Sequence, residues 1–240
     1  ASQPDPLYQA YLIEGNDVGG IDVGFLVKTS LVGANPRVQV LSVTQELDGT
    51  LFTNPDSSTE TLNDRPPLMI RAIVHGAGGG TYPVTVLVNH LRSMNDVDSD
   101  AAGSNGWPTL GARVRAKRQA QAVDLANLVQ ILQGENVLLV GDFNAFDVND
   151  SLGHLMATIV GAPADDATTA VSGDGADLVN PDLVDLGAAS PPAESYSYVF
   201  GFTAQKIDHA LVNAALVSSS LARRVEYARV NADFPEIDRS

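Results

Sequence analysis

Reactive side chains follow the apolar runs of this sequence at the points where the runs end. Asp142 and Asn144 come directly after Val137 to Val140, and His90 follows Tyr82 to Val88. An Asp and an Asn two residues apart at a strand end project to the same side, because side chains alternate with a period of two. A carboxylate and an amide so placed can hold one metal-bound water or one phosphate oxygen. The structural alternative is a turn, since Gly, Asp and Asn are ordinary turn residues.

Groups that suit phosphate chemistry also occur at the other strand ends. The imidazole of His90 can donate a hydrogen bond to a phosphate oxygen, and a guanidinium follows at Arg92. Asp208 interrupts the otherwise apolar run Gln205 to Val212, where burying an unpaired carboxylate would be costly. We therefore expect Asp208 to have a partner. For His90 the alternative is a hydrogen-bonded histidine that simply ends a strand.

The strongest helical pattern lies directly before the central apolar run. Residues 112–133 are predicted to form a helix with an apolar stripe and with Gly134 as its C-terminal cap. The stripe consists of Leu125, Leu128, Val129 and Leu132. A helix that leads into a buried strand at 137–140 is typical of layered α/β proteins. Other predicted strands cover 21–28, 37–44, 68–74, 82–88 and about 225–230, and a hairpin covers 195–200 and 205–212. Short helices are predicted at 152–160, with Ser151 as a candidate N-cap, and at 178–186.

The first turns of that helix carry the one dense basic cluster of an acidic chain. It consists of Arg113, Arg115, Lys117 and Arg118, and it follows a long polar loop at 94–111. Such a cluster is usually a solvated face, and a contact with substrate phosphate through Arg115 and Arg118 is the alternative. The formal net charge of −15 argues against a protein that holds nucleic acid by bulk electrostatics. It leaves room for an enzyme that meets a polyanion through divalent cations and a few arginines.

Composition predicts a single globular domain over residues 1–240. The chain is 44% hydrophobic and 18% charged, and it has no apolar run long enough to span a membrane. It contains no cysteine, which excludes disulfides and thiolate metal sites. An acidic, cysteine-free chain suggests an extracellular or periplasmic protein, with the cytoplasm as the alternative.

Three strand-end motifs together resemble the endonuclease/exonuclease/phosphatase superfamily. In chain order they are Asn-His-x-x-Ser at 89–93, Gly-Asp-Phe-Asn at 141–144 and Lys-Ile-Asp-His at 206–209. The resemblance covers nearly the whole chain and looks closest to the bacterial, often exported, branch. It implies a four-layer α/β/β/α sandwich of the deoxyribonuclease I-like type. It also implies a metal-dependent phosphoric-ester hydrolase that uses Mg²⁺ or Mn²⁺, with Ca²⁺ as a further candidate, most plausibly on nucleic acid.

Carried over residue by residue, the resemblance implies a role for each motif. Asp142 would orient or deprotonate the attacking water and contribute to the metal site, and Asn144 would hydrogen-bond the phosphoryl oxygen. His90 would donate to another non-bridging oxygen. Asp208 would hold and polarise a catalytic histidine. The adjacent His209 faces the other way on the strand and does not match that histidine by position. The candidates for binding substrate phosphate are Arg65, Arg92, Arg115 and Arg118.

The sequence departs from the family pattern at both ends. The family carries a metal-ligand Glu on an early strand and an Asp-His pair near its end, and neither has a match here. The resemblance therefore implies a domain that lacks its first strands and its last strand. Two alternatives stay open: a phosphoesterase of the same family that acts on phospholipid or inositol phosphate, and a non-catalytic binding module.

Overall fold

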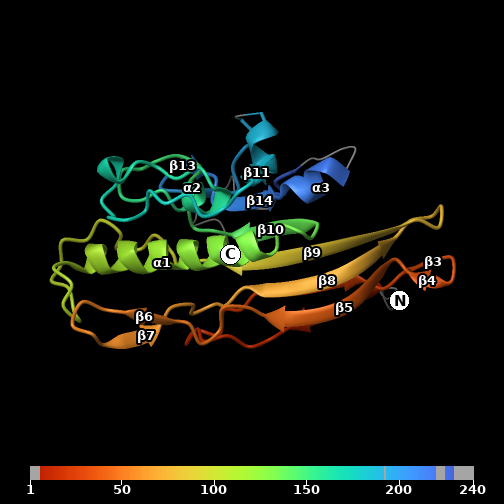
Figure 1. Cartoon of the computed structure of the whole chain (residues 1–240), viewed down its shortest axis with the longest axis horizontal. Coiled ribbons are helices and arrows are strands. Elements are labelled where there is room, and N and C mark those ends of the chain that lie inside the picture. Colours follow the sequence, from red (N-terminus) through yellow and green to blue (C-terminus); the bar gives the residue numbers. More distant parts are fainter. Residues whose placement is uncertain (1–5, 192, 220–224, 230–240) are drawn as a thin grey trace.

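The centre of the fold is a six-stranded mixed sheet. The computed structural model describes residues 6–191, 193–219 and 225–229. The sheet has the strand order β11-β14-β10-β9-β8-β5, in which β9 and β10 run parallel and all other neighbours run antiparallel. Figure 1 shows β9, β8 and β5 as successive neighbours, with α1 alongside. The strands are β5 (Val38–Gln45), β8 (Leu68–His75), β9 (Thr81–His90), β10 (Val137–Asp142), β11 (Val184–Asp185) and β14 (Asp208–Val212).

Four two-stranded sheets and a few helices complete the described part of the chain. The small sheets are β1 (Tyr8–Leu12) with β2 (Gly24–Lys28), β3 (Leu31–Val32) with β4 (Asn35–Pro36), β6 (Leu51–Thr53) with β7 (Thr59–Thr61), and β12 (Tyr198–Phe200) with β13 (Thr203–Gln205). The α-helices are α1 (Leu110–Ile131), α2 (Leu155–Val160) and α3 (Ala214–Ser219), and 3-10 turns cover Asp166–Thr168 and Leu186–Ala189. No helix of the described residues is long and apolar enough for a membrane crossing. The mixed α/β class is confirmed.

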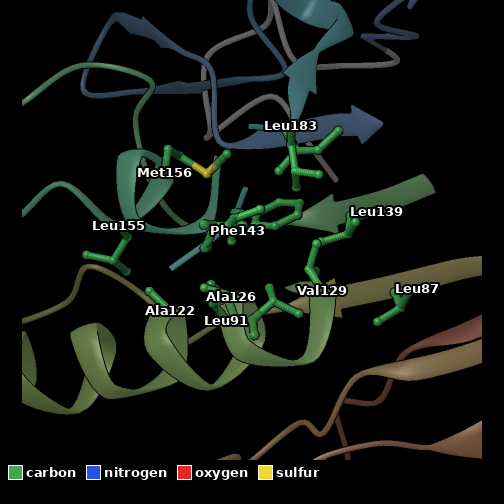
Figure 2. Close-up of a cluster of buried hydrophobic side chains, with 14 of the residues drawn as sticks. Leu87, Leu91, Ala122, Ala126, Val129, Leu139, Phe143, Leu155, Met156 and Leu183 are labelled. Carbon is green, nitrogen blue, oxygen red and sulfur yellow. The ribbon is translucent and has the colours of Figure 1, made fainter. Parts of the chain in front are cut away.

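Helices α1 and α2 cover one face of the sheet and form the main core with it. Leu87 and Leu139 project from β9 and β10 toward α1, and both are completely buried. Phe143, just after β10, fills the space between the sheet and the two helices (Figure 2). The predicted apolar stripe of α1 is confirmed, because Leu125, Val129 and Leu132 are buried and Leu128 packs against the same cluster. On the opposite sheet face the alternate residues of β9 and β10 are half-buried, whereas Leu68, Ile70 and Ala72 of β8 are buried.

Local predictions differ from the structure in four places. The predicted helix 178–186 is instead an irregular segment followed by β11, and Pro181 explains this because a proline removes a helical hydrogen bond. Ser151 does not cap α2, whose N-cap is His154 without a side-chain cap bond. The predicted hairpin forms, but between β12 and β13, while β14 joins the main sheet. Of a strand expected around 225–230, residues 225–229 form no regular element, and Val230 lies outside the described residues.

Gly141 lets β10 and β9 approach each other just before Asp142. Its φ is +129°, and a Cβ there would collide with the Asn89 carbonyl. We predict that Gly141→Ala lowers the free energy of unfolding by more than about 2 kcal/mol, because the substitution adds both strain and overlap. Gly134→Ala is the matched control, since no atom lies within 4 Å of its added Cβ. Urea denaturation measures both variants, and equal stability of the two would contradict the prediction.

Candidate active site

Three of the predicted site residues form one row across neighbouring strands. Asp142 is paired in register with His90 on parallel β9 and with Asp208 on antiparallel β14. Directly paired residues project from the same face of a sheet. The row therefore lies on the face opposite α1, at the end where β9 and β10 both finish. His90 and Asp208 are 52 and 66 positions from Asp142 in the sequence, and strand pairing brings them next to it.

Asp142 is a partly buried carboxylate with an unusually high pKa. Burial raises its pKa from 3.8 to about 6, and the like charge of Asp208 adds to this effect. The Asn144 backbone N–H, the Arg65 guanidinium and the charge of His209 act in the opposite direction. A carboxyl group with a pKa near neutrality is a suitable general base, because it is ionised at pH 7 and still accepts a proton readily.

Asn144 reaches the same site through a turn and not through strand alternation. β10 ends at Asp142, and Asn144 has a φ of +47°, a left-handed conformation that Asn tolerates well. Its backbone N–H donates to Asp142 Oδ1 over 2.7 Å, and its Nδ2 donates to the Leu91 carbonyl over 2.9 Å. The predicted reason for the pairing, alternation along a strand, was thus wrong, although both residues line the same cleft.

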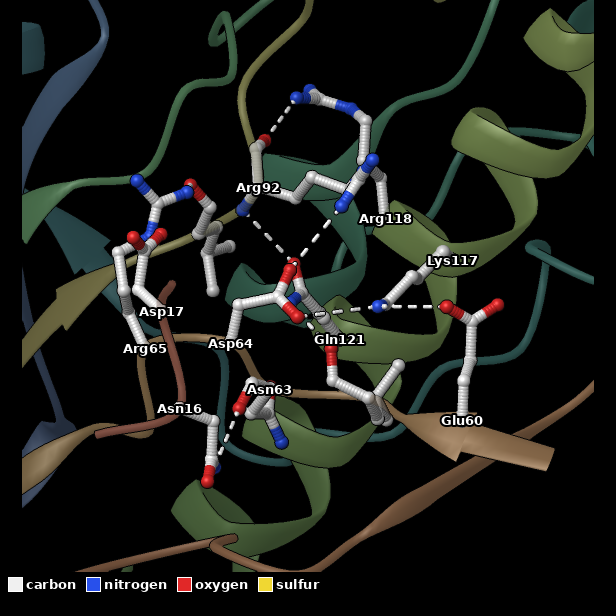
Figure 3. Close-up of polar contacts among 12 residues, drawn as sticks. Asn16, Asp17, Glu60, Asn63, Asp64, Arg65, Arg92, Lys117, Arg118 and Gln121 are labelled. Atoms are coloured by element: carbon white, nitrogen blue, oxygen red, sulfur yellow. Dashed lines mark hydrogen bonds and ion pairs between the residues drawn. The ribbon is translucent and has the colours of Figure 1, made fainter. Parts of the chain in front are cut away.

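His90 is held by Arg65. Arg65 NH1 lies 3.0 Å from His90 Nε2, and because a guanidinium only donates, this nitrogen accepts. Burial and the Arg65 charge lower the pKa of His90, so its ring is neutral at pH 7. The distance of 3.7 Å from Nε2 to Asp142 Oδ2 is therefore not an ion pair in this state. Asp17, which the sequence reasoning missed, lies beside Arg65 in Figure 3, and its charge opposes the fall in the His90 pKa.

Asp208 borders the same open cleft as Asp142 and Asn144. The cleft has a volume of about 530 Å³. Its other lining residues are Ser93, Met94, Asn95, Phe146, Ser197, Tyr198, Phe200, Gln205 and Ile207. The Asp208 backbone N–H donates to Ser197 Oγ over 3.1 Å, which joins the base of the β12–β13 hairpin to the carboxylate row. The partner expected for Asp208 is a catalytic histidine, and that role stays a prediction.

The basic residues of α1 have partners within the fold. Arg118 is 5% exposed and donates to two carbonyl oxygens, of Arg92 over 2.6 Å and of Asn144 over 2.7 Å. Arg115 donates to the Val97 carbonyl. Burial lowers the pKa of Arg118 to about 10, which leaves it charged at pH 7. These contacts favour a role in positioning the strand-end loops over a direct contact with substrate, and the predicted substrate role of both arginines is not tested.

A second charge network fixes the loop before β8 against α1. Asp64 pairs with Arg92 over 3.2 Å and with the buried Lys117 over 3.4 Å, and Lys117 also contacts Glu60 (Figure 3). Arg113 forms two hydrogen bonds of 2.6 Å with the Glu60 carboxylate. The guanidinium of Arg92, a predicted phosphate ligand, therefore already has the Asp64 carboxylate as a partner. Arg65 is the remaining predicted phosphate ligand that lies directly beside the carboxylate row.

A buried polar network lies on the α1 side of the sheet, opposite the row of His90, Asp142 and Asp208. Lys206 Nζ contacts Asp185 over 2.7 Å and Asp147 over 3.1 Å. His209 Nδ1 lies 3.1 Å from Asp185, and its Nε2 lies 2.9 Å from the Ala145 carbonyl. Segment 206–209 therefore holds the loop that follows Asp142 at two points. Sequence reasoning placed His209 on the other face from Asp208, which the register confirms, but missed Asp185 and Lys206.

The described residues offer a minimal donor set for a divalent cation. They contain no group of three or more His, Asp or Glu side chains placed to hold a metal. Two carboxylates, Asp142 and Asp208, nevertheless face one cleft, and their mutual repulsion contributes to the raised pKa of Asp142. Mg²⁺ commonly binds one or two carboxylates and completes its shell with water and substrate phosphate. The pair therefore fits a metal that is held partly by substrate.

Comparison with known proteins identifies the family to which the chain belongs. The sequence model of the endonuclease/exonuclease/phosphatase family matches residues 11–229. The chain belongs to this family. Its members are hydrolases of phosphoester bonds, which agrees with the chemistry of the carboxylate row. Among curated proteins, no significant match was found.

Solved structures of this family resemble the chain at low sequence identity. ANGEL2, a 2',3'-cyclic phosphatase, is 14% identical with a TM-score of 0.47, over 88% of this chain and 63% of that one. The human Nocturnin catalytic domain is 14% identical with a TM-score of 0.42, over 87% and 61%. A mannosyl-6-phosphatase of Bacteroides thetaiotaomicron is 12% identical with a TM-score of 0.41, over 88% and 64%. The chain thus spans less than two thirds of each of these structures.

Proposed function

We propose that this member of the endonuclease/exonuclease/phosphatase family is a metal-dependent phosphodiesterase whose attacking water is activated by Asp142. The observation that supports this is the row of Asp142, Asp208 and His90 at one sheet edge, with a carboxyl pKa of about 6 at its centre. Asp142 would accept the proton of the water as the water attacks phosphorus in line with the departing oxygen. A Mg²⁺ or Mn²⁺ ion near Asp142 and Asp208 would supply charge stabilisation at the phosphoryl group.

The remaining residues of the site would act on the phosphoryl oxygens. Asn144 Nδ2 has two hydrogens, of which the Leu91 carbonyl uses one, so the other can donate to an oxygen that gains charge in the transition state. Arg65 brings a positive charge next to the row and holds His90. These are hydrogen-bond donors fixed in advance by the fold, and such donors need little reorganisation as the reaction proceeds.

The second part of the proposal concerns the class of substrate. Nucleic acid was the first prediction from the sequence. The described arginines and lysines near the site have carbonyl or carboxylate partners, which favours a smaller phosphoester over a long polyanion. Hydrolysis of the phosphoester bond would follow the same steps for nucleic acid and for a smaller phosphoester. A non-catalytic binding module is the competing hypothesis, and it predicts ligand binding without turnover.

Metal dependence is the direct test of the reaction. We expect the natural gene product to hydrolyse bis(p-nitrophenyl) phosphate with Mn²⁺ or Mg²⁺, to lose at least about 99% of the rate in EDTA, and to regain it when excess metal is added back. Release of p-nitrophenolate measures the rate. Full activity after exhaustive chelation would reject the metal-dependent mechanism, and binding without turnover under all conditions would favour the binding module.

A further inference from the structure

Two polar side chains of α1 are buried although neither has a carboxylate partner. Arg118 is 5% exposed, and Gln121, which follows three positions later on the same side of the helix, is 3% exposed. Within the described residues, no ion pair includes Arg118. Burying a guanidinium without a carboxylate is costly, because the charge loses its hydration. The hydrogen bonds of both side chains go to main-chain groups near the site.

These two side chains bind both main-chain polar groups of Arg92. Its N–H donates to Gln121 Oε1 over 3.0 Å, and its carbonyl accepts from Arg118 NH1 over 2.6 Å (Figure 3). Gln121 Nε2 in turn donates to the Leu62 carbonyl over 2.9 Å. Arg92 lies two positions after His90, the last residue of β9. Helix α1 therefore fixes the main chain that follows His90.

The guanidinium of Arg118 also holds the main chain that follows β10. Its NH2 donates to the Asn144 carbonyl over 2.7 Å. Asn144 has the left-handed φ of +47°, and its own N–H donates to Asp142 Oδ1 over 2.7 Å. Asn144 thus connects Arg118 to the Asp142 carboxylate through its carbonyl on one side and its N–H on the other. A movement of this turn would change the direction of the carboxylate.

A guanidinium suits this contact better than an ammonium group. NH1 and NH2 of Arg118 lie in one plane at a fixed separation, and each donates to a different carbonyl. The group therefore sets the distance between the segments that follow β9 and β10. A lysine carries all its donors on one nitrogen, so Arg118→Lys keeps the charge but cannot bridge both carbonyls in the same geometry.

We propose that Arg118 and Gln121 are positioning residues that hold the ends of β9 and β10 in the arrangement in which His90, Asp142 and Asn144 meet one phosphoryl group. The catalytic consequence rests on the proposed function, whereas the positioning is a property of the free protein. Neither Arg118 nor Gln121 lines the cleft. Their loss should therefore lower kcat and leave KM nearly unchanged.

Kinetics of three variants test the catalytic consequence. With Mn²⁺ and bis(p-nitrophenyl) phosphate, Arg118→Lys in the natural gene product should lower kcat by about 10- to 100-fold and keep KM within about threefold, because small displacements of reacting groups are costly. Gln121→Ala should lower kcat less, since Arg118 still holds the Arg92 carbonyl. Gln119→Ala is the matched control and should keep kcat unchanged. Gln119 is also 5% exposed on α1, and its Nε2 donates to Thr158 Oγ1 of α2 over 3.0 Å.

Amide hydrogen exchange tests the positioning without turnover. In metal-free Arg118→Lys, the amides of Arg92 and Asn144 should exchange at least about tenfold faster than in the wild type, because the two segments open more often. The change at Leu139, in the centre of β10, should be smaller and measures any general loss of stability. Gln121→Ala should accelerate exchange at Arg92 and not at Asn144. NMR resolves each amide.

The outcomes separate this proposal from the proposed function. A raised KM with unchanged kcat in Arg118→Lys would mean that Arg118 contacts substrate directly and would overturn the positioning role. Unchanged kcat and KM, or an equal loss of kcat in Gln119→Ala, would overturn it as well. Exchange at Arg92 and Asn144 that rises no more than at Leu139 would have the same meaning. A wild type without turnover rejects the hydrolase proposal alone, because the exchange measurement still decides the positioning.

Discussion

Asp142→Asn should lower kcat/KM for phosphodiester hydrolysis by about 10²- to 10⁴-fold, the usual contribution of a positioned general base. Asn is nearly the same size as Asp and keeps the side-chain oxygen that accepts from the Asn144 backbone, so the turn should persist. What is lost is the proposed proton acceptor and one of the two carboxylates that would hold the metal. Steady-state kinetics with Mn²⁺ measure the effect, and Asp98→Asn, an exposed aspartate of the polar loop, is the control. Comparable rates for the two variants would remove Asp142 from the mechanism.

The same substitution should stabilise the metal-free protein. The pKa of Asp142 is about 6 in the folded state against 3.8 for the unperturbed carboxyl, so the folded state keeps a proton that the unfolded chain loses between these values. Stability of the wild type therefore falls as pH rises from about 4 to 6. Asp142→Asn lacks this fall and should be more stable at pH 7 in EDTA by about 1–2 kcal/mol, after allowance for partial exposure. A variant that is both inactive and less stable at pH 7 would indicate general misfolding instead.

Lys206→Met should be the most destabilising single change in the site. Lys206 is buried and neutralises Asp185 and Asp147, and removing one partner of a buried ion pair leaves an uncompensated charge. We expect the free energy of unfolding at pH 7 to fall by about 3 kcal/mol, with His209 keeping part of the compensation. Lys28→Met, a partly exposed lysine on β2 that contacts the Pro6 carbonyl and the Tyr8 ring but no carboxylate of the described residues, should change it by less than about 1 kcal/mol. Urea denaturation of both variants gives the comparison.

The pH dependence of stability identifies the cause of that loss. Burial alone would raise the pKa of Asp185, but hydrogen bonds from His209 and Lys206 lower it to about 2. A depressed pKa gives stability that is present above pH 4 and is lost as pH falls toward 2. Lys206→Met should weaken this acid dependence, so the two proteins should approach each other in stability at low pH. A constant difference at all pH values would mean that lost packing, and not lost charge, is the cause.

The strands and the long helix could be predicted because their signals are local. The apolar run 137–140 and the stripe of α1 depend only on neighbouring residues, and both are confirmed. The row of His90, Asp142 and Asp208 could be expected from three strand ends. Its geometry could not, because the register between strands depends on contacts that are distant in sequence.

The basic cluster of α1 shows what charge alone could not reveal about the site. In the sequence Arg118 belongs to a run of cations, and nothing local reveals that two loop carbonyls lie over it. Asp185 was equally hidden, since it lies in a segment with no pattern of its own and meets Lys206 and His209 only through the pairing of β11 with β14. The motif Lys-Ile-Asp-His did contain a signal. Asp208 and His209 are adjacent in a buried strand, so their polar side chains face opposite sides of the sheet and each side must supply a partner.

Hydrolysis in ¹⁸O-labelled water tests the central claim most directly. The natural gene product, with Mn²⁺ and bis(p-nitrophenyl) phosphate, should release p-nitrophenyl phosphate that contains one ¹⁸O atom after a single turnover, and p-nitrophenol that contains none. That result requires a water molecule to attack phosphorus at this site, and Asp142→Asn should suppress it. Label in the p-nitrophenol, or no turnover with either Mn²⁺ or Mg²⁺, would contradict the proposal that this carboxylate row hydrolyses phosphoesters.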